Sequence, residues 1–197
     1  MQIGHFDATH YPAQKPAHFI PERFLKTPPP APDFTEADRS IAIVASLYNR
    51  ELTDALTDSA HSELQAIAPN ATFPVFRVPG AFEIPVTIEN LCRKGQFSAI
   101  IALGVIVRGE TAHADLIAAS ITRTLQEISV RHAIPVIHEV LLVDTIEQAA
   151  ERVSGEEMNR GVEAARAAAG MADLFSQIES AYAAIDEEVE ESQTESS

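Results

Sequence analysis

The sequence predicts a three-layer α/β/α domain built around a central parallel sheet of four strands. Apolar residues change from strand-like runs to helical spacing and back four times along the chain, and the strand-like runs are continuous in Ile and Val. Continuous apolar runs are typical of strands that are covered on both faces, as in parallel sheets. Such alternation favours right-handed crossovers, with helices on both faces of the sheet.

The first half of the domain contains two strand and helix units. Residues 41–46 ("IAIVAS") are a short apolar run that suits a buried strand. The helical stripe that follows consists of Leu52, Leu56, Ala60, Leu64 and Ile67. Residues 72–78 ("TFPVFRV") return to strand character before a Pro-Gly turn. The next helical stripe consists of Ile84, Ile88 and Leu91.

The second half repeats the pattern. Residues 98–107 ("SAIIALGVIV") predict the strongest strand, and residues 135–143 ("PVIHEVLLV") predict the fourth. The helical stripe between them consists of Ile117, Ile121, Leu125 and Ile128. Two helices close the domain, a short one in "TIEQAAERV" and a long alanine-rich one from about residue 162 to residue 184.

Both ends of the chain differ from this domain, which spans residues 41–184. Residues 1–40 hold seven of the twelve prolines and predict an extended, irregular arm. Residues 185–197 carry six acidic residues without apolar periodicity and predict a solvated, disordered tail.

Composition limits the classes of protein to consider. A chain of 197 residues, 46% hydrophobic, buries enough surface to need no disulfide or structural metal, and Cys92 is expected to be an ordinary packed residue in a reducing compartment. The sequence has neither a signal peptide pattern nor an apolar run of about 18 residues, so we expect a cytoplasmic protein. A net charge of −15 disfavours nucleic acid and anionic membranes as partners, so an anionic substrate requires a local positive site.

Polar side chains gather where three of the predicted strands end. The segments are "SLYNRE" (46–51), "VPGAFEIP" (78–85) and "VRGETAHAD" (107–115). Ligands of parallel sheets bind beyond the carboxyl ends of the strands, so these segments should face one another. The side chains that they offer are Tyr48, Asn49, Phe82, Glu83, Arg108, Glu110, Thr111, His113 and Asp115.

Several of these residues also have a purely structural interpretation. Glu83 is either a helix-start carboxylate or a ligand, and Thr111 either caps a helix or directs its hydroxyl at an anion. The dipole of the following helix would keep His113 neutral and able to accept a proton at about pH 7, unless the ring is only structural. Asp115 suits a first helical turn, and Tyr48 suits a strand end.

Four motifs together resemble the lumazine synthase family. They are "IAIVASLYN", "VPGAFEIP", "ALGVIVRGETAHAD" and "DTIEQAAERV…NRG", which occur in this order over about residues 41–175. The resemblance implies a flavodoxin-like strand order 2-1-3-4. It also implies an enzyme of riboflavin biosynthesis that condenses 5-amino-6-(D-ribitylamino)uracil with 3,4-dihydroxy-2-butanone 4-phosphate. The products would be 6,7-dimethyl-8-ribityllumazine, phosphate and water, and neither a cofactor nor a metal is implied.

The resemblance implies a role for each segment. Tyr48 would stack on the pyrimidine ring, and Glu83 would accept hydrogen bonds from the ribityl hydroxyls. His113 would be the catalytic residue that transfers protons, and Arg152 would reach the phosphate from a neighbouring subunit. Main-chain amides near Thr111, with its hydroxyl, would also bind the phosphate. The substrate-binding set that is implied is Tyr48, Asn49, Ala81, Phe82, Glu83, Val105, Ile106, Val107, Glu110, Thr111, His138 and Arg152.

Two stretches depart from the family pattern. His138 stands where the family usually has an aromatic residue near the end of the fourth strand, although a histidine can also stack on a heterocycle. The usual "GTKAGNKG" is "VSGEEMNRG" here, which places Glu156 near a commonly basic position and Arg160 at a lysine position. We expect a lower phosphate affinity as a result.

The resemblance also implies a homo-oligomer, a pentamer with active sites between adjacent subunits, which some members assemble into a shell of sixty subunits. Residues around "PDFTEADRS" would then cover the sheet edge of a neighbour, and riboflavin synthase is a further partner to consider. Two alternatives stay open, a non-catalytic lumazine- or flavin-binding or shell-forming relative and a generic phosphate-binding α/β domain. His113 and Arg152 favour the enzyme, because a binding protein needs neither a proton carrier nor a phosphate arginine.

Overall fold

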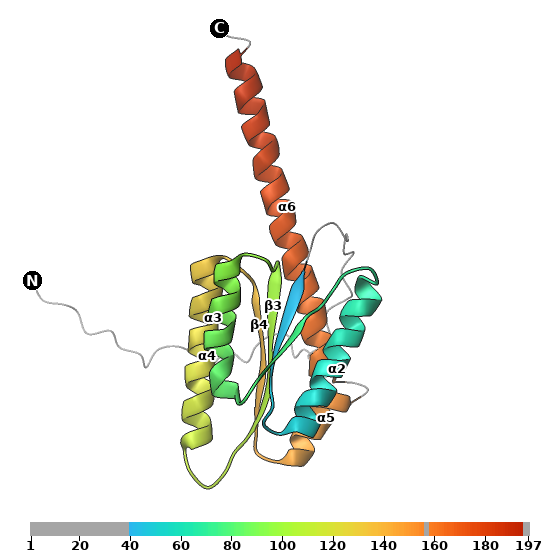
Figure 1. Ribbon diagram of the computed structural model, residues 1–197, viewed down its shortest axis with the longest axis vertical. Coiled ribbons are helices and arrows are strands. Elements are labelled where there is room, and N and C mark those ends of the chain that lie inside the picture. The colour runs from blue at the N-terminus through green and yellow to red at the C-terminus, as the bar shows by residue number, and fades with distance from the viewer. Residues whose placement is uncertain (1–39, 156–157, 195–197) are drawn as a thin grey trace, which may run out of the picture.

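A computed structural model describes residues 40–155 and 158–194, in which a parallel sheet lies between two layers of helices (Figure 1). The strands are β1 (Ile41–Ser46), β2 (Val75–Val78), β3 (Ala99–Val107) and β4 (Val136–Val143). Their order is β2-β1-β3-β4, and every neighbouring pair is parallel. The predicted fold class and strand order are therefore confirmed.

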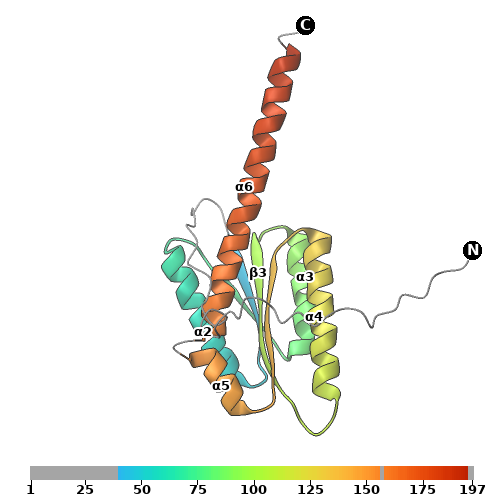
Figure 2. The ribbon, with the colours of Figure 1, turned by 180° about the vertical axis from the view of Figure 1, so that it is seen from behind.

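The helices cover the two faces of the sheet as the alternation predicted. Figures 1 and 2 show α3 and α4 on one face, and α2, α5 and the first part of α6 on the other. The bounds are α2 (Arg50–Ile67), α3 (Ile84–Lys94), α4 (His113–His132), α5 (Ile146–Ser154) and α6 (Arg160–Thr194). A short 3-10 helix, η2 (Ala81–Glu83), leads into α3.

Residues of β1 alternate between the two layers, and all six are buried. Ile41 and Ile43 join the apolar cluster under α2 and α6, whereas Ala42 and Val44 join the cluster under α3 and α4. This arrangement explains why the run is apolar throughout, because each face of a central parallel strand is covered by helices. Small residues let α6 approach closely; at Gly161 a Cβ atom would collide with the main-chain oxygen of Leu56.

The start of β2 and the end of α6 differ from the prediction, and part of the predicted chain lies outside the described residues. Strand β2 begins at Val75, after Pro74, rather than at residue 72. Helix α6 continues to Thr194, through most of the segment expected to be a disordered tail. Glutamate has a high helix propensity and extends a helix that is already nucleated, which favours this continuation. Residues 1–39, most of the predicted arm, lie outside the described part of the chain, as does Glu156.

Cys92 is buried in α3, as expected for a packed cysteine. Burial, with a contribution from Glu89, raises the pKa of its thiol to about 11, so the thiol is unreactive at neutral pH. Among the helices of residues 40–155 and 158–194, none is both long and apolar enough to cross a membrane.

Strand β4 holds Glu139 on the sheet face that α6 covers, since Glu139 pairs with Leu103 of the cluster under that helix. Burial raises the pKa of the Glu139 carboxyl to about 7, with Arg160 opposing the rise and Glu163 adding to it. Because the folded pKa exceeds the usual 4.5, the carboxyl of the unfolded chain ionises first, so the stability that Glu139 contributes falls as the pH rises from about 4.5 to about 7.

Glu139→Gln is therefore expected to raise the free energy of unfolding at pH 8 by about 1–3 kcal/mol and to change it little at pH 5, because the amide does not ionise. Urea unfolding at the two pH values measures both differences. The exposed Glu127→Gln on α4 is the matched control and should show no such dependence. A gain at pH 5 equal to that at pH 8 would contradict this account.

Candidate active site

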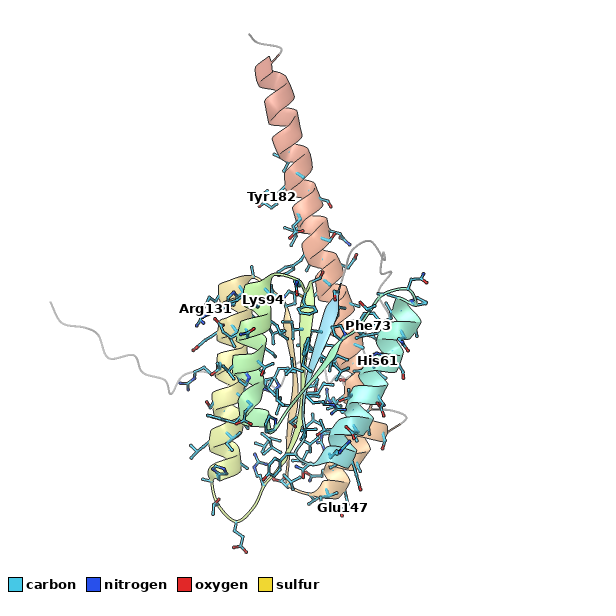
Figure 3. All side chains as sticks on the ribbon, in the orientation of Figure 1. His61, Phe73, Lys94, Arg131, Glu147 and Tyr182 are labelled. Carbon is cyan, nitrogen blue, oxygen red and sulfur yellow. The ribbon has the colours of Figure 1, made fainter. Side chains whose placement is uncertain are left out.

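A cleft of about 400 Å³ lies at the carboxyl ends of β1 and β3. Figure 3 marks this end of the sheet by Glu147, at the start of α5. Nine of the residues predicted for the site line the cleft, and they are Tyr48, Asn49, Ala81, Phe82, Glu83, Val105, Ile106, Val107 and His113. The three segments that were expected to meet therefore do so. Gly80 and Ile117 also line the cleft and were not predicted.

The turn between β1 and α2 holds Tyr48 over the cleft. Asn49 has left-handed backbone angles of φ 51° and ψ 47°, which asparagine tolerates better than most residues. Its side-chain nitrogen donates to the main-chain oxygen of Val105 at 2.8 Å, and the hydroxyl of Thr53 donates to the main-chain oxygen of Tyr48 at 3.0 Å. The Tyr48 side chain is 73% exposed, so one face of its ring is available for stacking. The side-chain oxygen of Asn49 and the second hydrogen of its amide nitrogen remain available to a ligand.

The Pro-Gly turn brings Glu83 against the main chain. A Cβ atom at Gly80 would lie 2.9 Å from Oε2 of Glu83 and 3.9 Å from Cδ2 of Tyr48, so the glycine gives the carboxylate its room. Glu83 is the N-cap residue of α3, but its side chain makes no capping hydrogen bond. Its oxygens are therefore free of the helix end, and Glu83 lines the cleft beside Phe82, which is 58% exposed.

Arg108 anchors the loop between β3 and α4. Its main-chain nitrogen donates to the oxygen of Val143 at 2.9 Å, at the end of β4. Its guanidinium donates from Nε to Asp115 at 3.0 Å and from Nη1 to Asp144 at 2.6 Å. These hydrogen bonds, to Asp115 first and Asp144 second, raise the pKa of Arg108 above its usual value. Arg108 and Asp115 therefore hold the loop in place and do not line the cleft.

The loop itself carries the predicted phosphate and proton-transfer residues. Glu110 and Thr111 are exposed and lie outside the cleft lining. The nitrogen of His113 donates to the hydroxyl of Thr111 over 3.5 Å, which is too long for a strong cap. His113 is the first residue of α4, exposed, and lines the cleft beside the helix N-terminus.

His138 lies in the first half of β4, as its third residue, so its expected place near the strand end is wrong. Its Nδ1 accepts from the nitrogen of Val140 at 3.3 Å, and its Nε2 lies 2.9 Å from the hydroxyl of Thr122. Because that hydroxyl donates to the oxygen of Ala118 at 2.8 Å, Nε2 carries the proton of the neutral ring. Burial lowers the pKa of His138 and keeps it neutral.

Arg152 lies in the last turn of α5, where its Nη1 donates to the main-chain oxygen of Gln148 at 3.0 Å. Neither Arg152 nor His138 lines the cleft of its own chain. Among the described residues, no group of three or more His, Cys, Asp or Glu side chains is placed to hold a metal ion. The cleft therefore combines an aromatic face, a free carboxylate and a histidine at a helix start.

Comparisons with known proteins agree with this geometry. A family model described as 6,7-dimethyl-8-ribityllumazine synthase matches residues 38–176. A curated protein of that name from Halorhodospira halophila is 37% identical over 143 residues, which cover 72% of this chain and 92% of the relative. Another from Chloroherpeton thalassium is 37% identical over 142 residues, with the same coverage of 72% and 92%. The family match begins just before β1 and ends within α6.

Proposed function

Because the chain belongs to the 6,7-dimethyl-8-ribityllumazine synthase family, we infer that it is a lumazine synthase, an enzyme of riboflavin biosynthesis. It condenses 5-amino-6-(D-ribitylamino)uracil with 3,4-dihydroxy-2-butanone 4-phosphate and releases phosphate and water. The observation that carries this conclusion is a family match that spans the whole sheet, together with a cleft lined by nine predicted residues. A non-catalytic relative is not favoured.

The direct test mixes the purified protein with both substrates and follows the fluorescence of the lumazine product. We expect product to form faster than in the same mixture without protein, because the cleft aligns the two substrates. A protein that binds the pyrimidine substrate without accelerating product formation would instead support the non-catalytic alternative.

We assign the pyrimidine substrate to the inner part of the cleft. The exposed ring of Tyr48 offers an offset stacking surface for a heterocycle, and Phe82 offers a second apolar face. The carboxylate of Glu83, free of the helix end, accepts hydrogen bonds from neighbouring ribityl hydroxyls. The side-chain oxygen of Asn49 adds an acceptor, and residues 105–107 supply main-chain groups at the end of β3.

We assign the phosphate of the second substrate to the start of α4. Main-chain N–H groups at a helix N-terminus point outward and favour an anion, and the hydroxyl of Thr111 adds a donor. The side chain of Glu110 lies outside the cleft lining, which removes a like charge from the phosphate. In a chain of net charge −15, the remaining positive charge comes from Arg152 of a neighbouring subunit.

We assign proton transfer to His113. Imine formation between the substrate amine and carbonyl, loss of phosphate, and ring closure each move a proton, and a neutral imidazole both accepts and returns one. The ring belongs to the first residue of α4 and lines the cleft. The same helix start therefore offers both the phosphate site and the proton-transferring side chain.

The assignment requires an oligomer, because Arg152 and His138 do not line the cleft of their own chain. We propose a cytoplasmic homopentamer in which each cleft is completed by the adjacent subunit. The shared site needs only the pentamer and does not depend on further assembly into a shell. Light scattering at moderate salt tests it. A mass near five chains or a multiple of five supports the shared site, and a mass near one chain contradicts it.

Arg108 provides a further prediction about this site. Arg108→Ala is expected to lower kcat/KM for the phosphate-bearing substrate roughly 10- to 100-fold. Without the Arg108 contacts the loop shifts, and small displacements of Thr111 and His113 misalign them with the substrate. Steady-state kinetics measure the effect. Arg93→Ala is the control, since Arg93 forms an ion pair with Glu89 away from the cleft. An equal loss in both variants would exclude a positioning role for Arg108.

A further inference from the structure

The second part of α6 projects past the end of the sheet that lies opposite the cleft (Figure 1). The first part of the helix packs on the sheet through small residues, among them Ala165, Ala168 and Ala172, which are all buried. Figure 3 shows Tyr182 on the helix beyond the body of the domain. The projecting part therefore has a side that the described part of its own domain leaves uncovered.

Exposed apolar side chains follow this uncovered side of α6. Leu174 and Ile178 are each 45% exposed, Ile185 is 54% exposed, and Ala181 is exposed as well. Their spacings of four, three and four residues are those of the a and d positions of a coiled coil, which lie along one side of a helix. We call these four residues the α6 seam. Tyr182, which is 66% exposed, lies beside it.

The other side of the helix faces the domain and carries the charge. Glu179 follows buried Ala172 by seven residues, so the two lie on the same side of α6. Both line a cavity of about 390 Å³ between the helix and the turns before β3 and β4. Glu179 is the only charged residue in the sequence between Leu174 and Ile185. The α6 seam is therefore uncharged as well as apolar.

These properties limit what can cover the α6 seam. A basic segment would find no acidic residue in the seam with which to pair. A second α6 seam is complementary, because apolar side chains at a and d positions pack between those of a like helix. Such a pair brings no charged side chain of the seam into the contact. The net charge of −15 on each chain then opposes pairing only over longer distances, which salt screens.

Most of the α6 seam also lies beyond the part of the chain that its relatives match. The family match ends at residue 176, and the alignment to the Halorhodospira halophila relative covers 92% of that protein but 72% of this one. Ile178, Ala181 and Ile185 follow the end of that match. The seam is therefore an addition to the family domain, separate from Arg152 and His138, which complete the cleft of a neighbour in the proposed pentamer.

We propose that the α6 seam pairs with the α6 seam of a second copy of this chain. The same surface is used on both copies, so a two-fold axis passes near the middle of the contact, between Ile178 and Ala181. A ring of five chains has no two-fold axis of its own. In the proposed pentamer the seams therefore pair between rings and not within one ring.

The size of the α6 seam suits a contact between rings. About three turns of helix bury less than the roughly 800 Å² per partner of a typical stable interface, so a single pair of seams holds two separate chains weakly. Where two rings face each other, formation of one pair holds the remaining seams at a high effective concentration. Several weak contacts then act together.

Ile178→Asp tests the pairing, because it places two carboxylates near the middle of the contact. Light scattering at about 0.15 M salt is expected to give the wild type at least twice the mass of this variant. Ala183→Asp is the matched control, since Ala183 is exposed on the side of Glu179, four residues away, and should keep the wild-type mass. Equal masses for the wild type and Ile178→Asp would overturn the proposal, as would an equal loss of mass in Ala183→Asp.

The same masses separate this inference from the proposed shared active site. A mass of about five chains for Ile178→Asp, with about ten chains or more for the wild type, supports both claims. A variant of about one chain and a wild type of about two chains would support the pairing of the seams and contradict the pentamer.

A second test measures proximity across the two-fold axis. Ala181→Cys keeps every large apolar side chain of the α6 seam, and oxidation should link it to its own copy as a dimer band on a non-reducing gel. Cys92 is buried and does not compete. Ala183→Cys, exposed on the other side of the same helix, should remain a single chain on that gel. An Ala181→Cys protein that forms no linked dimer would show that the two seams do not meet.

Discussion

His113→Ala is expected to lower kcat by roughly 10²-fold, near the lower limit for general acid and base help, because the two substrates are reactive once aligned. The melting temperature and the oligomeric state should be unchanged, since the side chain is exposed at the start of α4. The pH profile of the steady-state rate should also differ in shape between the variant and the wild type, because the variant lacks the proton-transferring side chain.

The matched control is His132→Ala, at the other end of the same helix. His132 pairs with Glu89 at 3.0 Å, between α4 and α3, and does not line the cleft. We expect its loss to affect stability and not turnover. If His113→Ala kept the wild-type pH profile at a reduced rate, the proton-transfer role of His113 would be wrong.

Arg152→Ala is expected to raise KM for the phosphate-bearing substrate about 10- to 100-fold, since a charged hydrogen bond contributes on the order of 1.5–3 kcal/mol. KM for the pyrimidine should change far less, because that substrate carries no phosphate. Steady-state kinetics with each substrate varied in turn measure the asymmetry. Arg152→Lys keeps the positive charge but lacks the planar guanidinium, so its KM for the phosphate-bearing substrate should lie between those of the wild type and Arg152→Ala. Equal changes for both substrates would indicate a structural role for Arg152.

Mixed oligomers test whether the residues come from different subunits. Neither single variant can form a complete site if a cleft needs His113 from one chain and Arg152 from the next. Co-expression of His113→Ala chains with Arg152→Ala chains should then regenerate complete sites, about a quarter of the total for random mixing around a ring. Mixed oligomers that regain no activity would place both residues in one subunit.

The fold and the cleft-lining segments could be predicted because both follow from local patterns. A continuous run such as residues 41–46 is apolar throughout only when both faces are covered, which β1 confirms by its complete burial. Parallel strands end at one edge of a sheet, so Tyr48, Glu83 and His113 were expected to meet, and they line one cleft. The resemblance to a family then supplied chemical roles that the patterns alone left open.

Local sequence was a weaker guide to the extent of the last helix and to single positions within strands. The acidic residues after residue 184 were expected to be disordered, whereas α6 continues to Thr194. His138 was expected near a strand end, whereas it stands third in β4 beside Thr122. The preceding helix explains the first difference, because a helix that is already nucleated extends into residues of high helix propensity. The second arose from the family pattern, since the predicted strand at residues 135–143 already placed His138 in its first half.

The sequence by itself determined the layers, the strand order expected of the family, and the edge of the sheet that carries the site, because burial period and chain direction are local properties. Only the tertiary structure decided which polar groups remain free there. Asn49 gives its side-chain nitrogen to Val105, 56 residues away, and Arg108 binds Asp144, 36 residues away. The physical reason is that a hydrogen bond depends on two atoms meeting within about 3 Å, and no spacing along the chain specifies such a meeting between separate elements.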